Sequence, residues 1–97
     1  MAGYIILRKF TQQGLATIKE LPERVKHAKQ LSEDMGIRTI GVWITMGEYD
    51  SISIVDAPDE QTLAAYLLGR AKTGNSTTTT MRAFSEEEFA QIVAKLP

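Results

Sequence analysis

The chain has 97 residues, a formal net charge of −1 and no cysteine, and 43% of its residues are hydrophobic. These values predict a single globular domain spanning residues 1–97, and they exclude disulfide bonds, thiolate metal sites and a cysteine nucleophile. Because the 11 Lys and Arg residues are scattered and no apolar run approaches a membrane span or a signal segment, we expect a cytoplasmic protein that binds neither nucleic acid nor membranes.

The first third of the chain predicts a strand followed by a helix. Residues 3–10 are rich in β-branched and aromatic side chains, which indicates a strand. Residues 11–19 are expected to form a connection that Gly14 loosens. Residues 20–35 place apolar side chains at helical spacing, and Gly36 follows where a C-terminal cap glycine belongs.

Two alternating apolar runs then flank the turn Gly47-Glu48-Tyr49-Asp50. They cover residues 37–46 and 51–55, and strict alternation around a short glycine-containing connection predicts a β-hairpin. Within the turn, Gly47 is suited to a positive φ, and the Asp50 carboxylate is suited to accepting hydrogen bonds from backbone groups.

The rest of the chain predicts a helix, a strand and a final helix. Acidic residues after a proline indicate a helix over residues 58–72, and the threonine-rich residues 76–84 indicate a fourth strand. Ser85 and Glu88 form a capping-box pattern that opens the last helix. The order β-α-β-β-α-β plus one helix predicts an α+β, ferredoxin-like domain with a four-stranded antiparallel sheet.

Alternation sorts the strand side chains into two faces. We expect an aliphatic face to lie under the helices, formed by Ile5, Leu7, Ile40, Val42, Ile44, Ile52, Ile54, Met81 and Ala83. The other face mixes aromatic, arginine and hydroxyl side chains, among them Tyr4, Arg8, Phe10, Trp43, Ser51, Ser53 and Arg82. Aromatic and arginine side chains are enriched at the centres of protein interfaces, and a chain this short buries only a modest core. We therefore expect this second face to meet its counterpart on another copy, giving a homodimer.

The turn and its surroundings resemble the GYD domain family, which is named for a Gly-Tyr-Asp signature. The matching residues are Gly47, Tyr49 and Asp50, and Glu48 separates the glycine from the tyrosine. Other matching features are Pro22 and Arg24 in the first helix, Met35-Gly36 before the hairpin, and residues 55–59 after it. The resemblance covers nearly the whole chain and implies a dimeric α+β barrel, in which two ferredoxin-like subunits stack sheet to sheet. It implies no established biochemical function, because the fold relatives differ in activity.

The expected ligand-binding residues are Tyr4, Arg8, Trp43, Tyr49 and Arg82. Guanidinium groups beside aromatic rings suit an acidic or partly aromatic small molecule. The same arginines can equally pair with acidic residues or stack on rings at the subunit contact.

Catalytic candidates carry a weaker signal. Tyr49 and Asp50 are a phenol and a carboxylate that can exchange protons, and His27 is the imidazole of the chain, a residue type that acts as a general base. Structural alternatives are a turn held by Asp50, a packed Tyr49 ring and a partly solvated His27. A lone histidine without cysteine gives no metal-ligand pattern, and no phosphate-binding glycine loop is present, so we expect neither a metal nor a cofactor.

Three functions fit these observations. The first is a homodimeric module that binds a small molecule between the sheet and its cover. The second is a cofactor-free enzyme of the monooxygenase or isomerase type found among the fold relatives that the resemblance implies. The third is a structural or regulatory oligomer without a ligand.

Overall fold

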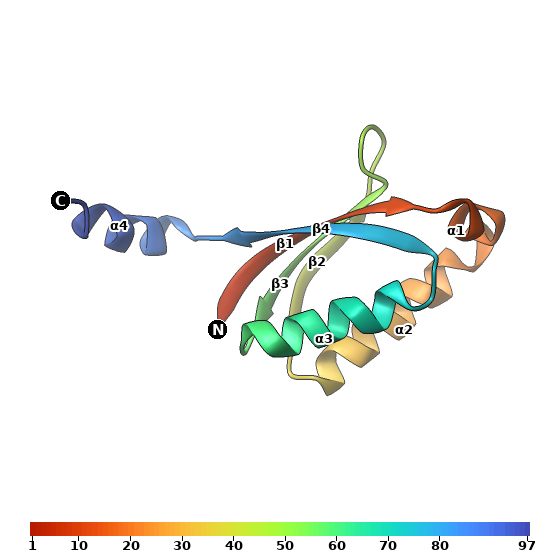
Figure 1. Cartoon of the computed structure of the whole chain (residues 1–97), viewed down its shortest axis with the longest axis horizontal. Coiled ribbons are helices and arrows are strands. Elements are labelled where there is room, and N and C mark those ends of the chain that lie inside the picture. Colours follow the sequence, from red (N-terminus) through yellow and green to blue (C-terminus); the bar gives the residue numbers. More distant parts are fainter.

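The computed structural model describes residues 1–97 as one sheet with two long helices on one side (Figure 1). The elements are β1 (Ala2–Phe10), α1 (Gln12–Ala16), a 3-10 turn (Ile18–Glu20), α2 (Leu21–Asp34), β2 (Arg38–Ile44), β3 (Ser51–Ala57), α3 (Glu60–Ala71), β4 (Ser76–Ala83) and α4 (Glu86–Ala94). The sheet order is β2-β3-β1-β4, and all neighbouring strands are antiparallel. The predicted α+β, ferredoxin-like fold is therefore confirmed.

The helix ends follow from local capping groups. The Asp59 side chain accepts a 2.7 Å hydrogen bond from the Thr62 N–H at the start of α3. Ser85 and Glu88 form a reciprocal capping box at the start of α4, with N···O distances of 3.1 and 3.0 Å. Gly36 follows α2 with a φ of 77°, a conformation that favours glycine. These contacts satisfy backbone groups that a helix end leaves without a partner.

The segment predicted to be a loose connection instead contains α1. Thr11 caps this helix by accepting a hydrogen bond from the Gly14 N–H at 3.1 Å, and the Thr11 hydroxyl donates to the Gly74 carbonyl at 2.6 Å. Gly14 is buried, and a Cβ there would collide with the backbone carbonyl of Asn75. Gly14 thus permits a close approach between α1 and the α3–β4 loop, and the expectation that it loosens the segment was wrong.

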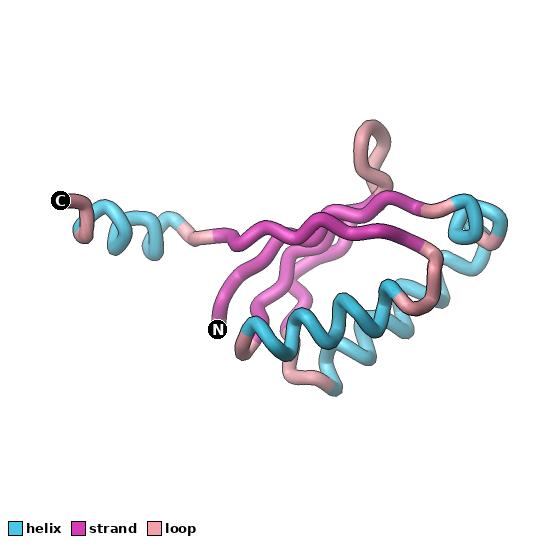
Figure 2. The backbone as a smooth tube through the Cα atoms, viewed as in Figure 1, coloured by secondary structure: helices cyan, strands magenta, loops and turns pink.

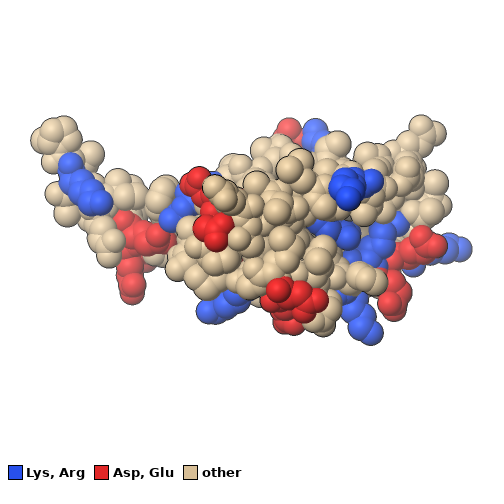
Figure 3. All heavy atoms as spheres, turned by 60° about the horizontal axis from the view of Figure 1, so that its bottom comes forward, with Lys and Arg blue, Asp and Glu red and all other residues tan.

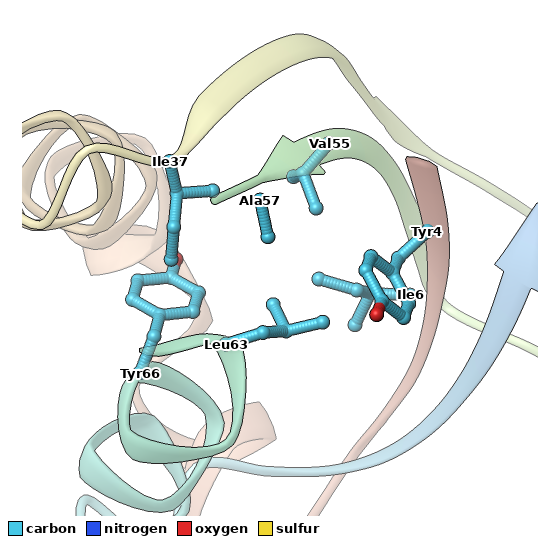
Figure 4. Close-up of a cluster of buried hydrophobic side chains, with 7 residues drawn as sticks. All are labelled: Tyr4, Ile6, Ile37, Val55, Ala57, Leu63 and Tyr66. Atoms are coloured by element: carbon cyan, nitrogen blue, oxygen red, sulfur yellow. The ribbon is translucent and has the colours of Figure 1, made fainter. Parts of the chain in front are cut away.

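The hydrophobic core lies between the sheet and helices α2 and α3. Its seven buried side chains come from β1, β3, α3 and the residue before β2, and they are Tyr4, Ile6, Ile37, Val55, Ala57, Leu63 and Tyr66 (Figure 4). Ile6 and Ala57 are fully buried, and Ile37 is 1% exposed. Apolar area removed from water here is the main term that holds the helices on this face.

The expected orientation of the sheet was wrong. Tyr4 and Ile6 face the helices, so their neighbours Ile5 and Leu7 face the opposite way. Side chains of directly paired residues lie on the same face of the sheet. Ile54 of β3 and Met81 of β4 are paired with Ile5, so they also face away from the helices. Alternation separates two faces but does not say which one the helices cover. Here the aliphatic set forms most of the uncovered face, and the arginine and hydroxyl set lies under the helices.

A β-bulge makes β2 an exception to simple alternation. The register with β3 shifts between Thr39 and Gly41, so Ile40 and Trp43 lie on the open face. Val42 and Ile44 lie on the helix side, as expected. The Trp43 ring covers Gly41, where a Cβ would collide with the indole. A glycine at this position therefore leaves the space that the indole ring occupies.

The overall shape is extended for a chain of this size. Figures 1 and 2 show α4 standing away from the body at the end of β4, while the far side of the sheet carries no helix. The accessible surface is 6796 Å², against about 5,500 Å² for a compact monomer of this mass. The radius of gyration is 14.7 Å, against roughly 12.5 Å for a compact chain of this length. None of the helices is long and apolar enough to cross a bilayer.

Candidate functional site

A cavity lined by both polar and apolar side chains lies between the helix-covered face of the sheet and helices α2 and α3. Its volume is about 70 Å³, and its lining includes Arg8, Ser51, Ser53, Tyr66 and Arg70. It adjoins the core at the end of the sheet where β1 leads into α1. This volume accommodates a few water molecules or one small polar group, and it is well below the size of a drug-like ligand.

Arg8 reaches this cavity from β1. Its Nη1 donates a 2.6 Å hydrogen bond to the Ser53 hydroxyl on the neighbouring strand. Burial lowers the pKa of Arg8, the nearby Tyr66 opposes this shift, and the nearby Arg70 adds to it. No carboxylate pairs with Arg8, since the ion pair found in the chain joins Arg82 and Glu88. The site therefore holds a partly buried positive charge without a matching negative one.

The remaining charged side chains of the lining are also cations. Arg24, Lys29 and Arg70 border the cavity, and neither Asp nor Glu does. Arg24 has a structural role as well, because its guanidinium donates to the Thr17 carbonyl and hydroxyl and to the Gly14 carbonyl at 3.1, 2.7 and 3.3 Å. Figure 3 shows Lys and Arg side chains gathered on this side of the body, toward the end opposite α4.

The Gly47-Glu48-Tyr49-Asp50 segment is an exposed turn outside the cavity. Gly47 has a φ of 119°, as the turn chemistry predicts. Asp50 accepts a 2.7 Å hydrogen bond from the Phe10 N–H. The Tyr49 ring lies 5.3 Å from the Lys9 ammonium. The backbone carbonyl of Tyr49 accepts a 2.6 Å hydrogen bond from the Thr45 hydroxyl. These contacts fix the turn against β1.

The structure brings two of the five expected ligand residues together, since the Arg82 guanidinium lies over the Tyr4 ring at 5.6 Å, but it does not assemble all five at one site. Arg8 alone lines the cavity, while Tyr4 belongs to the core and Trp43 lies on the open face. Arg82 stacks on Phe84 at 4.4 Å, and Tyr49 lies in the turn.

Two further features bear on catalysis and metals. His27 is exposed on α2 and borders a separate shallow surface region next to Glu23. No group of three His, Asp or Glu side chains is placed to hold a metal ion.

Sequence reasoning missed Lys29 and Arg70 as neighbours of the site. Strand alternation had already placed Arg8, Ser51 and Ser53 on one face, which was the available signal. The contribution of α2 and α3 depends on how the helices lie across the sheet, and local patterns do not carry that information.

Together the strand order, the two covering helices and the uncovered second face define a ferredoxin-like α+β domain. The chain belongs to the GYD domain family, whose model matches residues 4–93. This confirms the resemblance carried by Gly47, Tyr49 and Asp50.

One relative and one solved structure of similar fold extend the comparison. The chain is 33% identical over 97 residues to a protein of Thermus thermophilus called glutamine synthetase and cystathionine beta-lyase binding protein, and the match covers 99% of each chain. The crystal structure of FFRP-DM1 superposes with a TM-score of 0.62 at 19% identity, covering 87% of this chain and 100% of that one. At that identity the second match concerns the fold alone.

Proposed function

We propose that this protein is a homodimeric binding module. Two copies pair through their open sheet faces, and each copy binds a small molecule at the cavity beneath α2 and α3. The single observation that carries the binding role is the unfilled cavity next to the apolar core, since an interior is normally filled to crystal-like density.

Two observations support the dimer, namely the apolar side chains exposed on the open face and the large accessible surface area of the single chain. Ile40, Trp43 and Met81 are 53%, 51% and 44% exposed, and they lie on the same side as Ile5 and Ile54. Contiguous apolar patches of this kind mark interaction sites on soluble domains. The surface excess of about 1,300 Å² over a compact monomer exceeds the roughly 800 Å² that each partner contributes to a standard interface.

A cavity-filling variant tests the binding role. Ala28 on α2 lines the cavity, and Ala28→Leu would occupy part of its volume. Ala64→Leu on the exposed side of α3 is the matched control. We expect compounds from a metabolite mixture to raise the melting temperature of the wild type and of Ala64→Leu but not of Ala28→Leu. Equal responses in the three proteins, or none in the wild type, would contradict a ligand in this cavity and favour an oligomer without a ligand.

A protein partner is a second candidate, suggested by the name of the Thermus relative and by one feature of this structure. Helix α4 exposes three apolar side chains, Phe89, Ile92 and Val93, the exposed Leu96 follows the helix end, and the helix stands apart from the body (Figure 1). A free apolar helix face is suited to docking in a groove of another protein. Removal of residues 85–97 should abolish co-elution with purified glutamine synthetase or cystathionine beta-lyase if this helix is the docking element.

A further inference from the structure

We propose that the cavity binds the oxyanion group of an acidic small molecule, a carboxylate or a phosphate, with Arg8 as its principal ligand. This inference rests on the proposed binding function and specifies the chemistry of the group that enters the cavity. The cavity volume of about 70 Å³ suits one such group, while the rest of the molecule would remain outside.

The first argument is the unmatched charge of Arg8. A guanidinium has five N–H donors, and one of them is used in the fold, for the bond to Ser53. A partly buried cation without an opposite charge is unfavourable, and the lowered pKa of Arg8 has this physical cause. An oxyanion would supply the missing charge and can accept two parallel hydrogen bonds from the guanidinium fork.

The second argument is the composition of the lining. Arg70 and Lys29 add positive charge to that of Arg8, and no acidic side chain borders the cavity. The hydroxyls of Ser51 and Ser53 are buried beside it and can donate to an oxyanion. Like charges placed around one small volume repel each other, so an anion relieves the repulsion as well as the desolvation.

The third argument is the contrast with the other arginines. Arg82 pairs with Glu88 at 3.3 Å and stacks on Phe84, and Arg24 bonds three backbone or hydroxyl oxygens. These two side chains have structural partners of their own. Arg8 instead points its charge into a space that the protein leaves unfilled.

Titration calorimetry and ¹H–¹⁵N NMR with inorganic phosphate and with succinate, each compared with chloride at equal ionic strength, test the proposal. We expect saturable binding, with amide shifts centred on Ser51 and Ser53. Stronger binding of succinate than of phosphate identifies a carboxylate ligand, and the reverse order identifies a phosphate. Absence of saturable binding by both anions, or shifts that match those in chloride, would overturn the oxyanion assignment.

Charge-removing variants assign the ligand residues. Arg8→Gln should weaken anion binding about tenfold or more, because it removes a charge-assisted pair of hydrogen bonds. Arg38→Gln, an exposed arginine of β2 outside the cavity, is the matched control and should bind as the wild type does. Equal affinity in Arg8→Gln and the wild type would refute Arg8 as the ligand. If Arg8→Gln does not fold, Arg70→Gln provides the same test and should bind several-fold more weakly.

The outcomes also separate this inference from the proposed function. A neutral compound that stabilises the wild type but not Ala28→Leu, with no response to either anion, would overturn the oxyanion assignment and leave the binding role standing. No binding of any compound would overturn both. Anion binding by a protein that stays monomeric would support the cavity assignment and refute only the dimer.

Discussion

The Asp50 carboxylate accepts a 2.7 Å hydrogen bond from the Phe10 backbone N–H at the end of β1. The Asp50 N–H in turn donates to the Arg8 carbonyl at 2.8 Å. The last residue of the Gly-Tyr-Asp signature therefore holds the backbone of the strand that carries the cavity arginine. Gly47 permits the turn that brings Asp50 to this position.

Substitution of Asp50 should lower the stability of the fold. We expect Asp50→Ala to reduce the free energy of unfolding by about 1–3 kcal/mol, because the Phe10 N–H loses a charged acceptor. Urea denaturation measures this change. Glu48→Gln, in the same turn and exposed, is the control and should leave the unfolding midpoint unchanged. A midpoint for Asp50→Ala equal to that of the wild type would show that the bond contributes nothing.

Two glycines should respond in opposite directions to alanine. At Gly14 the new Cβ collides with the Asn75 carbonyl, so Gly14→Ala should destabilise the protein by about 1–3 kcal/mol. At Gly69, inside α3, a Cβ meets open space, so Gly69→Ala should stabilise it by roughly 0.5–1 kcal/mol. Thermal unfolding of both variants measures the difference. If Gly69→Ala is also less stable than the wild type, the space beside Gly69 is not open in solution, for example because a partner fills it.

A charge on the open face should prevent dimer formation. Ile54→Arg introduces a guanidinium in the middle of the face, opposite Ile5, where a second copy would bury it without a partner. Leu68→Arg is the matched control, since Leu68 is 68% exposed on the outer side of α3. Sedimentation velocity should give a dimer for the wild type and Leu68→Arg and a monomer for Ile54→Arg. A monomeric wild type at micromolar concentration would refute the sheet-to-sheet pairing.

Trp43 provides an independent measurement of the same interface. It is the sole tryptophan, and half of its surface is exposed in the single chain. If the open faces pair, its fluorescence maximum should move to longer wavelength when the protein is diluted below its dissociation constant. An emission maximum typical of a water-exposed indole at all concentrations would argue against burial of this face.

The start of α4 should show a defined pH dependence. The hydrogen bond from the Ser85 backbone N–H lowers the pKa of Glu88 from its ordinary value of 4.5, and Arg82 adds to the shift. Because the folded-state pKa lies below the unfolded one, the stabilisation is present above pH 4.5 and disappears as pH falls through the folded pKa. The NMR shift of the Ser85 amide should titrate in this range. Glu88→Gln should remove the titration, whereas Glu87→Gln should preserve it.

Much of the backbone could be predicted from local patterns. The capping residues Asp59 and Ser85 mark helix starts through contacts within a few residues, and Gly36 marks a helix end in the same way. Segment 11–19 was missed because α1 depends on contacts with Gly74 and Asn75, more than sixty residues away. The bulge after Thr39 was missed because it is a property of pairing with β3.

The sequence by itself determined the order of the four strands and of the helices other than α1, the ferredoxin-like class and the family, because these depend on spacing and capping along the chain. Only the tertiary structure decided that Tyr4 and Ile6 lie beneath the helices, that Ile5 and Ile54 lie on the open side, and that Arg8 and Arg70 line the same cavity. The physical reason is that alternation has two equivalent solutions, related by turning the sheet over. Packing of Leu63 and Tyr66 against one face, far apart in sequence from β1, selects between them.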